Sequence, residues 1–326
     1  RQGVSLRLAF GDCSSGNPCK FTVATDSFNG FSGTLLRIDC WVGLDDTVPL
    51  NLPSGLLHLT FGGTGLMEIP KNLLRNLDTL QQITFRRHKI NVITEDSLST
   101  INKGLRVFEI GNGDLDSLQG KPFQRLSKLA GLILDGNKIS DLSPGVFDGL
   151  GELQRVNLRE NRLMKIRRYV FISEHIKLEQ IDFSYNQIRD IESNAFSNLN
   201  LKALDLTGNK FTVFANHYLN NLKRLDVLML RRCHQLVKIE PLAFEGIVGE
   251  TWRITSNYAL TELVGDTFNG LHLEKDLVLD DNNHLQKVRE NAFRNLSVEV
   301  ISIRGSAIED KDISKWGLGP GVKVVF

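Results

Sequence analysis

The sequence predicts an α/β solenoid of about eleven repeats of 23–25 residues, with a curved parallel β-sheet on its concave face. Two observations predict it. The segment Gly136–Leu158 returns in altered form at Tyr185–Leu206, with an Asn, an Ile and a Phe at the same spacings. A register with apolar positions 1, 4 and 6 and a special position 9 then recurs from Leu56 onward. Each such repeat buries its apolar face by stacking on its neighbours, which is how a solenoid is built.

The first position of this register recurs every 23–25 residues. It falls at Leu56, Leu80, Leu105, Leu129, Leu153, Leu178, Leu201, Leu225, Gly249, Glu274 and Val298. Alternation around positions 4 and 6 predicts a short strand with one buried face. The ninth position is Asn in six repeats: Asn137, Asn161, Asn186, Asn209, Asn257 and Asn282. A buried amide must be hydrogen-bonded, so we expect these residues to form a structural ladder that bonds backbone groups of neighbouring turns.

A second column is aromatic and recurs about 24 residues apart. Its members are Phe123, Phe147, Phe171, Phe196, Phe244, Phe268 and Phe293. Regular spacing inside a repeat favours a packed spine on the convex side over a cofactor site. Near the carboxyl end, Trp316 and the segment of residues 322–326 are expected to shield the last turn.

The period, and the Asn or Cys at position 9, resemble the leucine-rich-repeat family. The resemblance extends over more than four-fifths of the chain and implies the fold, whereas function depends on the surfaces that the fold carries. It implies an amino-terminal cysteine cap over residues 1–55, repeats over 56–321 and a closing strand over 322–326. Within the cap, Thr34–Cys40 is expected to form a strand that pairs with Phe21–Phe28 as a hairpin.

Extracellular members of this family usually carry four cysteines in the cap, and this chain has three there. A Cys19–Cys40 disulfide is the preferred bridge, with Cys13–Cys19 as the open alternative. The spare thiol, Cys13 in the first case, either links the chain to a partner or stays shielded. Cys233 occupies a ninth position and is expected to be a buried thiol. Asn295 heads the one N-x-S/T sequon, a glycosylation site compatible with secretion.

Composition and motifs exclude several classes of function. The formal net charge of +1 gives no general attraction to nucleic acid or anionic membrane. The sequence has no run of 18 apolar residues, so no membrane span is expected, and it begins without Met, as a processed product would. Catalytic motifs are missing and the seven histidines show no metal-ligand spacing. We therefore expect no cofactor, no metal and no enzymatic activity, and we expect His88 to be a hydrogen-bonded core histidine.

The candidate site is the outward face of the concave sheet. Position 5 brings Asp182 and Asp205 onto neighbouring strands, about 4.8 Å apart along the ladder. Such a pair could serve acid–base chemistry, but the open sheet favours a patch neutralised by arginines of position 7 or a patch that contacts a ligand. The predicted partner-binding residues are Ile133, Arg155, Arg159, Asp182, Asp205, Met229, Arg231 and Arg253.

An alternative surface is the edge of repeats eight to ten. These repeats carry one extra residue after position 9, in CHQL, NYAL and NNHL, which moves the next apolar residue to Leu236, Leu260 and Leu285. The turns are expected to bulge there, and Gln235 or His284 would then contact a partner. Whether the concave face or this edge binds is left open by the sequence.

Eleven strands make an arc of roughly 50 Å, which suits a protein partner better than a small molecule. We therefore predict a secreted, non-enzymatic protein that holds a partner in a hetero-oligomer. The chain resembles the non-catalytic leucine-rich-repeat subunit of Oplophorus-type shrimp luciferase and its crustacean relatives, which implies a small catalytic subunit as partner. The alternative is the ectodomain of a cell-surface receptor of the Toll-like or glycoprotein-hormone-receptor kind, whose repeats Arg253–Leu271 resembles.

Overall fold

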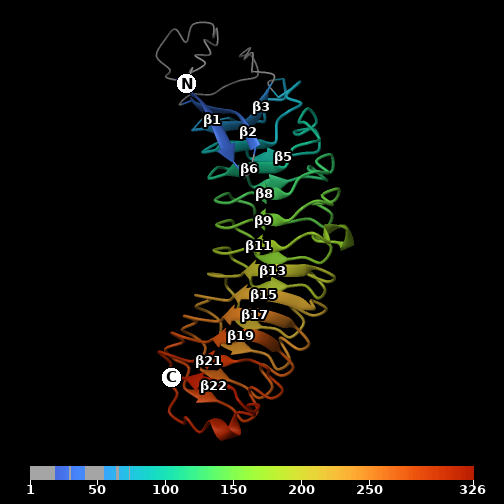
Figure 1. Ribbon diagram of the computed structural model, residues 1–326. Helices are drawn as coiled ribbons and strands as arrows, with labels where there is room; N and C mark the ends of the chain where they lie inside the picture. Colours follow the sequence, from blue (N-terminus) through green and yellow to red (C-terminus); the bar gives the residue numbers. More distant parts are fainter. Residues whose placement is uncertain (1–18, 29–30, 41–54, 64–65, 73) are drawn as a thin grey trace. The chain divides into compact units, whose positions relative to one another are not determined.

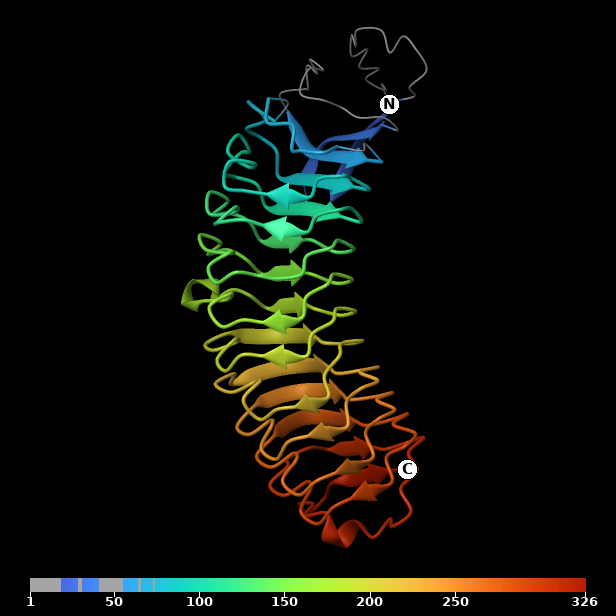
Figure 2. The same cartoon turned by 180° about the vertical axis from the view of Figure 1, so that it is seen from behind.

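The computed structural model describes residues 19–28, 31–40, 55–63, 66–72 and 74–326, of which 19–28 and 31–40 are described by their backbone alone. These residues form two compact units. The first contains the described residues up to Ile139 together with Val146–Leu153, and the second contains Ser140–Gly145 and Gln154–Phe326. Each unit is a stack of solenoid turns whose strands pair in parallel, visible from two sides in Figure 1 and Figure 2. Together the two units hold about eleven solenoid turns.

The first unit begins with an antiparallel pair and continues as a parallel sheet. Its long strands are β1 (Cys19–Phe28), β2 (Phe31–Cys40), β3 (Leu56–Gly62), β4 (Gln82–Arg86), β6 (Val107–Gly111) and β8 (Gly131–Ile133). β1 pairs with β2 antiparallel, and β2, β3, β4, β6 and β8 pair successively in parallel. The short strands β5 (Val92–Ile93) and β7 (Ser117–Leu118) pair in a separate two-stranded sheet. The predicted hairpin before the first repeat is therefore confirmed.

The second unit is a parallel sheet throughout. Its long strands are β9 (Arg155–Asn157), β11 (Gln180–Asp182), β13 (Asn200–Asp205), β15 (Arg224–Met229), β17 (Val248–Arg253), β19 (His272–Val278), β21 (Val300–Ser302) and β22 (Lys323–Val325). Two-residue strands pair on the return side, opposite the main sheet. They are β10 (Lys165–Ile166) with β12 (Asp190–Ile191), β14 (Val213–Phe214) with β16 (Lys238–Ile239), and β18 (Glu262–Leu263) with β20 (Lys287–Val288).

Helix is nearly absent from the part of the chain that the structure describes. The return segments, where an α/β fold often places helices, are turns and these two-residue strands. Two 3-10 helices interrupt them, η1 (Ser173–His175) and η2 (Ile313–Lys315). A repeat of 23–25 residues leaves few residues for the return path once the strand and its turns are made, which accounts for the short elements.

The core follows the predicted register with one correction. The sixth-position residues, from Phe61 to Ile303, are at most 1% exposed in all eleven repeats. In the tenth repeat, however, Leu273 is buried and Glu274 is exposed, so the assignment of Glu274 to position 1 is wrong. The strand pairing shifts by one residue between Gly249 and Thr251 against β19, which places an extra residue there and turns Glu274 to solvent.

The asparagines of position 9 are buried and bond the backbone of two turns. Asn186 shows the pattern: its Nδ2 donates to the carbonyls of Phe183 in its own turn (3.0 Å) and Leu158 in the preceding turn (2.9 Å). Its Oδ1 accepts from the backbone N–H of Leu163 at 3.0 Å. Asn209 repeats this geometry one turn later. Each amide thus satisfies backbone groups that the turn would otherwise leave unpaired in the core.

The predicted aromatic spine is confirmed within each unit. In the second unit Phe244, Phe268 and Phe293 stack with centroid distances of 5.6 and 5.3 Å, and all three are fully buried. Trp316 continues the column at 5.8 Å from Phe293 and is 2% exposed, so it covers the last turn as expected. In the first unit Phe123 and Phe147 stack at 6.2 Å.

Position 8, directly before the ladder residue, adopts left-handed backbone in every repeat. The residues are Gly63, Arg87, Asn112, Gly136, Glu160, Tyr185, Gly208, Arg232, Ser256, Asp281 and Gly305, with φ between 52° and 73°. A side chain other than Gly, Asn or Asp costs about 1 kcal/mol in this conformation. The sharp turn after each strand therefore favours Gly, Asn or Asp at position 8. Arg87, Glu160, Tyr185 and Arg232 adopt this conformation despite their larger side chains.

The cap cysteines are placed in part. The antiparallel register makes Cys19 and Cys40 direct partners across β1 and β2. Directly opposed residues of an antiparallel pair have Cα atoms about 4.5–5.5 Å apart, a separation that a disulfide can bridge. The Cys19–Cys40 bridge stays a prediction, supported by this register, and Cys13 lies outside the described residues.

Candidate functional site

The fifth position of each repeat forms a continuous row on the solvent face of the sheet. In the second unit the strand register places these residues directly side by side, in the order Asn157, Asp182, Asp205, Met229, Arg253, Val278 and Ser302. Arg253 is exposed, and the other six are half-buried. The row thus brings two carboxylates, two apolar side chains and one guanidinium onto five successive strands.

Both aspartates of this row cap the backbone that follows their strand. Oδ1 of Asp182 accepts from the N–H of Ser184, and Oδ1 of Asp205 accepts from the N–H of Thr207, each at 2.8 Å. Asn157 makes the same contact one repeat earlier, with the N–H of Arg159 at 3.0 Å. These side chains stabilise the sharp turn into the left-handed position 8.

The arginines of position 7 make their close contacts elsewhere, although the charge of Arg159 lowers the pKa of Asp205. Arg159 instead pairs with Glu160 (2.8 Å), donates to Ser184 Oγ (3.2 Å) and lies over the ring of Tyr185, 4.3 Å from its centroid. Arg231 donates from Nε to Thr255 Oγ1 at 3.3 Å. Both aspartates accept hydrogen bonds from backbone N–H groups two residues further along the chain.

Burial raises the pKa of Asp205, and the neighbouring charge of Asp182 adds to this shift, while hydrogen bonds from Thr207 and the charge of Arg159 oppose it. A separated pair of pKa values is what acid–base catalysis by two carboxylates requires. Here each carboxylate has an oxygen held by a backbone N–H, which is a structural role. The geometry therefore favours an interaction surface over a reaction centre.

The remaining predicted partner-binding residues divide between the units. Ile133 lies on β8 of the first unit and is half-buried. Arg155 projects from β9 of the second unit and is exposed. Met229 and Arg253 are register partners on β15 and β17, and Arg231 lies two residues beyond Met229. In the second unit, therefore, the structure brings Asp205, Met229 and Arg253 together directly.

An ion-pair network in the first unit escaped the sequence analysis. Arg86, at the end of β4, pairs with Glu109 on β6 and with Asp135 after β8, where Nη1 lies 3.0 Å from Oδ2. Burial disfavours the charge of Arg86, but the hydrogen bonds and charges of Asp135 and Glu109 outweigh it and raise the pKa of the guanidinium. Thr84 donates to Glu109 at 3.3 Å. Three charges on three successive turns thus satisfy one another.

Gly111 makes this network possible. Arg86 and Asp135 come from turns two apart, and Gly111 is the position-7 residue of the turn between them. A Cβ at Gly111 would lie 2.6 Å from Arg86 Nη1 and 2.8 Å from Asp135 Oδ1. Opposite charges 49 residues apart in the same register position, with a glycine midway, were the signal in the sequence that could have revealed the pair.

The extra residues of repeats eight to ten form β-turns on one edge of the second unit. Backbone N–H groups of Leu236, Leu260 and Leu285 donate to the carbonyls of the ladder residues three positions earlier, at 2.8–3.1 Å. All three leucines are fully buried, as the sequence predicts. The residues within these turns point outward and contact one another: the ring of His234 stacks on Tyr258 at 4.9 Å, and His284 Nδ1 lies 2.7 Å from the Tyr258 carbonyl.

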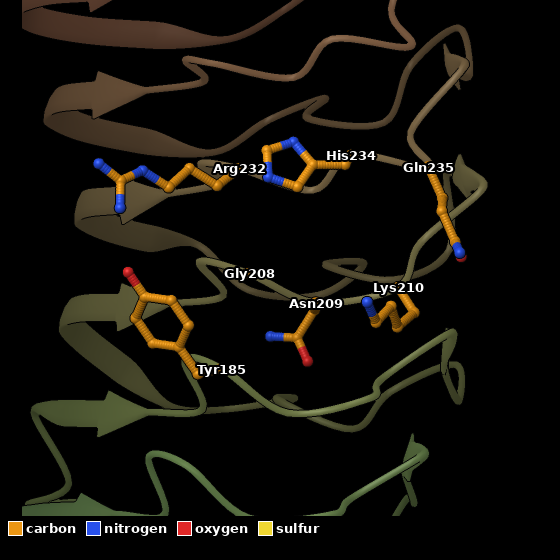
Figure 3. A pocket seen from close by; sticks show the side chains of 7 residues that line it. All are labelled: Tyr185, Gly208, Asn209, Lys210, Arg232, His234 and Gln235. Carbon is orange, nitrogen blue, oxygen red and sulfur yellow. The ribbon is translucent and has the colours of Figure 1, made fainter.

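A hollow of about 260 Å³ opens beside the first of these turns. Its lining residues are Tyr185, Gly208, Asn209, Lys210, Arg232, His234 and Gln235. Figure 3 shows Tyr185 and Arg232 at one end and Lys210 and Gln235 at the other. Gly208 lies in the turn between those of Tyr185 and Arg232, and a Cβ there would stand 2.9 Å from the Tyr185 ring. The hollow therefore exists because position 8 of the middle turn has no side chain.

Five ladder positions hold residues other than asparagine: Thr64, His88, Gly113, Cys233 and Ser306. Cys233 is a free, buried thiol whose pKa burial raises to about 12, so it is unreactive in the folded chain. His88 is 2% exposed, and burial lowers its pKa to about 4. The expectation of a core histidine is therefore confirmed by its burial, and the ring is neutral at pH 7, whereas its hydrogen bonding stays a prediction.

Other expected features concern single residues and absences. Asn295 is exposed, and its Nδ2 donates to Asn269 Oδ1 at 3.0 Å. Across the described ranges, no helix is long and apolar enough to cross a membrane. The same ranges hold no group of three or more His, Cys, Asp or Glu side chains that could bind a metal ion.

Comparison with known proteins agrees with the geometry of the repeat. The family model described as leucine rich repeat matches residues 103–163 and 151–211. One chain of the solved octameric complex of Latrophilin 3, Unc5D and FLRT2 superposes with a TM-score of 0.54 at 18% identity, covering 86% of each chain. The fold is a leucine-rich-repeat solenoid.

Curated relatives of this leucine-rich-repeat solenoid include receptors and smaller proteins. It is 27% identical to human Toll-like receptor 5 over 209 residues, which cover 62% of this chain and 24% of the receptor. It is 24% identical to Tsukushi from Gallus gallus over 261 residues, covering 77% of this chain and 68% of Tsukushi. The solenoid thus spans about a quarter of the length of the receptor.

Proposed function

We propose that this leucine-rich-repeat solenoid is an extracellular, non-enzymatic protein that holds a protein partner on the sheet face of its second unit. The observation that carries the proposal is the row Asp205, Met229, Arg253 and Val278 on four successive strands. Half-buried apolar side chains flanked by charged ones are what the centre of a protein interface requires. A small ligand would instead need a closed, mostly apolar pocket.

The relatives support this proposal. Tsukushi, Lumican and the Toll-like receptors are non-enzymatic leucine-rich-repeat proteins, and Tsukushi and Lumican are secreted. The solved structure that contains FLRT2 is a complex with other proteins. The assembly of FLRT2 with other proteins in that structure supports protein binding as the proposed function.

The test begins with native purification and identification of the chain that co-elutes. Its affinity is then measured for Met229→Glu and Arg253→Glu, with Lys287→Glu as the control, because Lys287 is exposed on the return side of the same unit. Each sheet-face variant is expected to weaken binding by about 1–3 kcal/mol, and the control by less than about 0.5 kcal/mol. Asp205 is unsuited to this test because its loss also removes the cap on Thr207.

The competing surface is the bulged edge. Binding that survives the Met229 and Arg253 variants but is lost on changing Gln235 or His284 would assign the partner to that edge and overturn the sheet-face proposal. The same purified material shows whether the partner is attached by a disulfide, as expected if Cys13 is the spare thiol of the cap.

A second candidate function is the ectodomain of a cell-surface receptor, which the match to Toll-like receptor 5 favours. Sequencing of the full transcript tests it, since a receptor continues into a membrane span. A more specific version of the main proposal is that the chain is the stabilising subunit of a secreted luciferase. It rests on the sequence resemblance alone, and light emission by the co-eluting material with a luciferin tests it.

A further inference from the structure

The hollow beside Gly208 is bordered by basic and hydrogen-bond-donating groups. Lys210 and Arg232 are cations, and Tyr185, His234 and Gln235 add polar side chains. Among the residues described, no carboxylate lines the hollow, and no ion pair engages Lys210 or Arg232. The site is thus positively charged and lacks an internal counter-ion.

In the first unit, the space over a glycine between two turns is filled by an ion pair. Over Gly111, side chains from turns two apart meet as the Arg86–Asp135 ion pair. Over Gly208, Tyr185 and Arg232 also come from turns two apart, but neither is acidic and the space between them stays open. The residue type missing from the second arrangement is a carboxylate.

The volume indicates the size of the occupant. Sites for small organic ligands usually measure about 300–1,000 Å³. A hollow of about 260 Å³ that is open to solvent is closer to the size of one or two amino-acid side chains. The ring of Tyr185, fixed beneath Arg159 at 4.3 Å, offers a flat apolar wall for the methylene groups of such a side chain.

We infer that this hollow binds the carboxylate side chain of a glutamate or aspartate on the protein partner, with Arg232 and Lys210 as its cationic contacts. The inference rests on the proposed function in one respect, since the partner supplies the acidic residue. It extends that function by assigning an acidic segment to the partner and a second point of contact beside the sheet face. Charge complementarity of this kind fixes the orientation of the partner and accelerates association.

A fluorescent hexaglutamate peptide tests the site without the native partner. Saturable binding to the full chain is expected by fluorescence anisotropy at low salt. Arg232→Gln and Lys210→Gln should each weaken it about three- to tenfold, the range expected for a partly exposed charge pair. Lys238→Gln is the matched control, because it removes the same charge from the same repeat at an exposed position of β16, and it should change the affinity by less than twofold.

A second variant tests the space itself. Gly208→Asn places a neutral side chain in the hollow, at a position where Asn112 already adopts the same left-handed conformation in the third repeat. It should reduce hexaglutamate binding at least as much as Arg232→Gln while circular dichroism shows an unchanged fold. Competition by inorganic sulfate but not by acetate would indicate a site for sulfate-like oxyanions and overturn the carboxylate assignment.

Other outcomes are also decisive. Binding that is absent, or weakened equally by Lys238→Gln and Arg232→Gln, overturns the inference, because it shows unspecific attraction to positive charge. These results are separable from the fate of the proposed function, which fails if the native partner is insensitive to Met229→Glu and Arg253→Glu whatever the peptide does.

Discussion

One glycine in each unit, Gly111 in the first and Gly208 in the second, separates side chains of turns two apart. Over Gly111 the space is filled by Arg86 and Asp135, which lie 3.0 Å apart. Over Gly208 it is an open hollow bordered by Tyr185 and Arg232. Both places lack one side chain, at position 7 of the repeat for Gly111 and at position 8 for Gly208.

The difference teaches how a repeat protein converts a common scaffold into distinct surfaces. Deleting one side chain from a regular row creates a gap of fixed width, because the ladder and spine set the distance between turns. Whether the gap becomes a structural ion pair or an open hollow lined by cationic side chains depends on the residues that border it. Four substitutions test this comparison, from the largest expected effect to the smallest.

The turn that carries Arg86 is expected to be sensitive to acid, unlike the turn that carries Tyr185. His88 occupies the ladder position of the turn that carries Arg86, and its pKa falls from 6.5 to about 4 on burial. The unfolded chain therefore binds the proton more tightly, and stability is lost as pH falls from 6.5 toward 4. The loss is about 3 kcal/mol, at about 1.4 kcal/mol per pKa unit.

Denaturant unfolding at pH 7.5, 5.5 and 4, followed by circular dichroism, measures this loss. His88→Asn should flatten the dependence by roughly that amount, whereas His272→Asn, at an exposed histidine, should leave it unchanged. An identical pH dependence in the wild type and His88→Asn would mean that folding does not shift the pKa of His88.

The turn that carries Tyr185 depends on Asn186 for its spacing. Asn186→Ala removes four hydrogen bonds, among them the one that the buried N–H of Leu163 donates to Asn186 Oδ1. The expected cost is about 1–3 kcal/mol of unfolding free energy. Thermal unfolding measures it against Asn200→Ala, an exposed asparagine on β13, and equal midpoints for the two variants would contradict the ladder.

Closing the first gap should break its ion pair. Gly111→Ala places a Cβ within 3 Å of Arg86 Nη1 and Asp135 Oδ1, so one of them must move. We expect a loss of about 1–2 kcal/mol that shrinks when Asp135→Asn is already present. Gly131→Ala is the control in the same unit, since its Cβ would meet nothing nearer than the Val107 side chain at 3.6 Å.

Filling the second gap with a carboxylate should give Arg232 an ion-pair partner. Both Asp and Asn tolerate the left-handed backbone of Gly208, so Gly208→Asp and Gly208→Asn differ mainly in charge. Gly208→Asp should be the more stable by about 0.5 kcal/mol at low salt, through attraction to Arg232. Chemical denaturation in 0.05 and 0.5 M NaCl checks this, and an advantage that persists in Arg232→Gln would show that Arg232 is not the partner.

Much of the fold could be predicted because each position of the register occurs in eleven repeats. Core positions 4 and 6 and the aromatic spine obey the spacing, so one misfitting residue such as Glu274 did not mislead the rest. The bulge at β19 could not be foreseen, since moving the register by one residue exchanges Leu273 for Glu274 with little change in pattern.

The candidate site was less predictable. Strand alternation correctly put Asp205, Met229 and Arg253 on one face, because side chains of a strand alternate. It could not show that Asp205 caps the N–H of Thr207, since that depends on the turn geometry that follows. The hollow at Gly208 was missed for a related reason: its walls lie two repeats apart, and its defining feature is an absent side chain.

Cys233 gives the second unit a built-in reporter of its own transient opening. The thiol is fully buried, and the backbone N–H of Cys233 donates to Asn257 Oδ1 in the next turn. A soluble alkylating reagent therefore reaches the sulfur only when neighbouring turns separate. Its rate of modification therefore measures how often the stack comes apart at repeat eight, in the manner of amide exchange. A partner bound to the adjacent surface would slow that rate. The reactivity of one cysteine thus reports both the local opening of the solenoid and the binding of a partner.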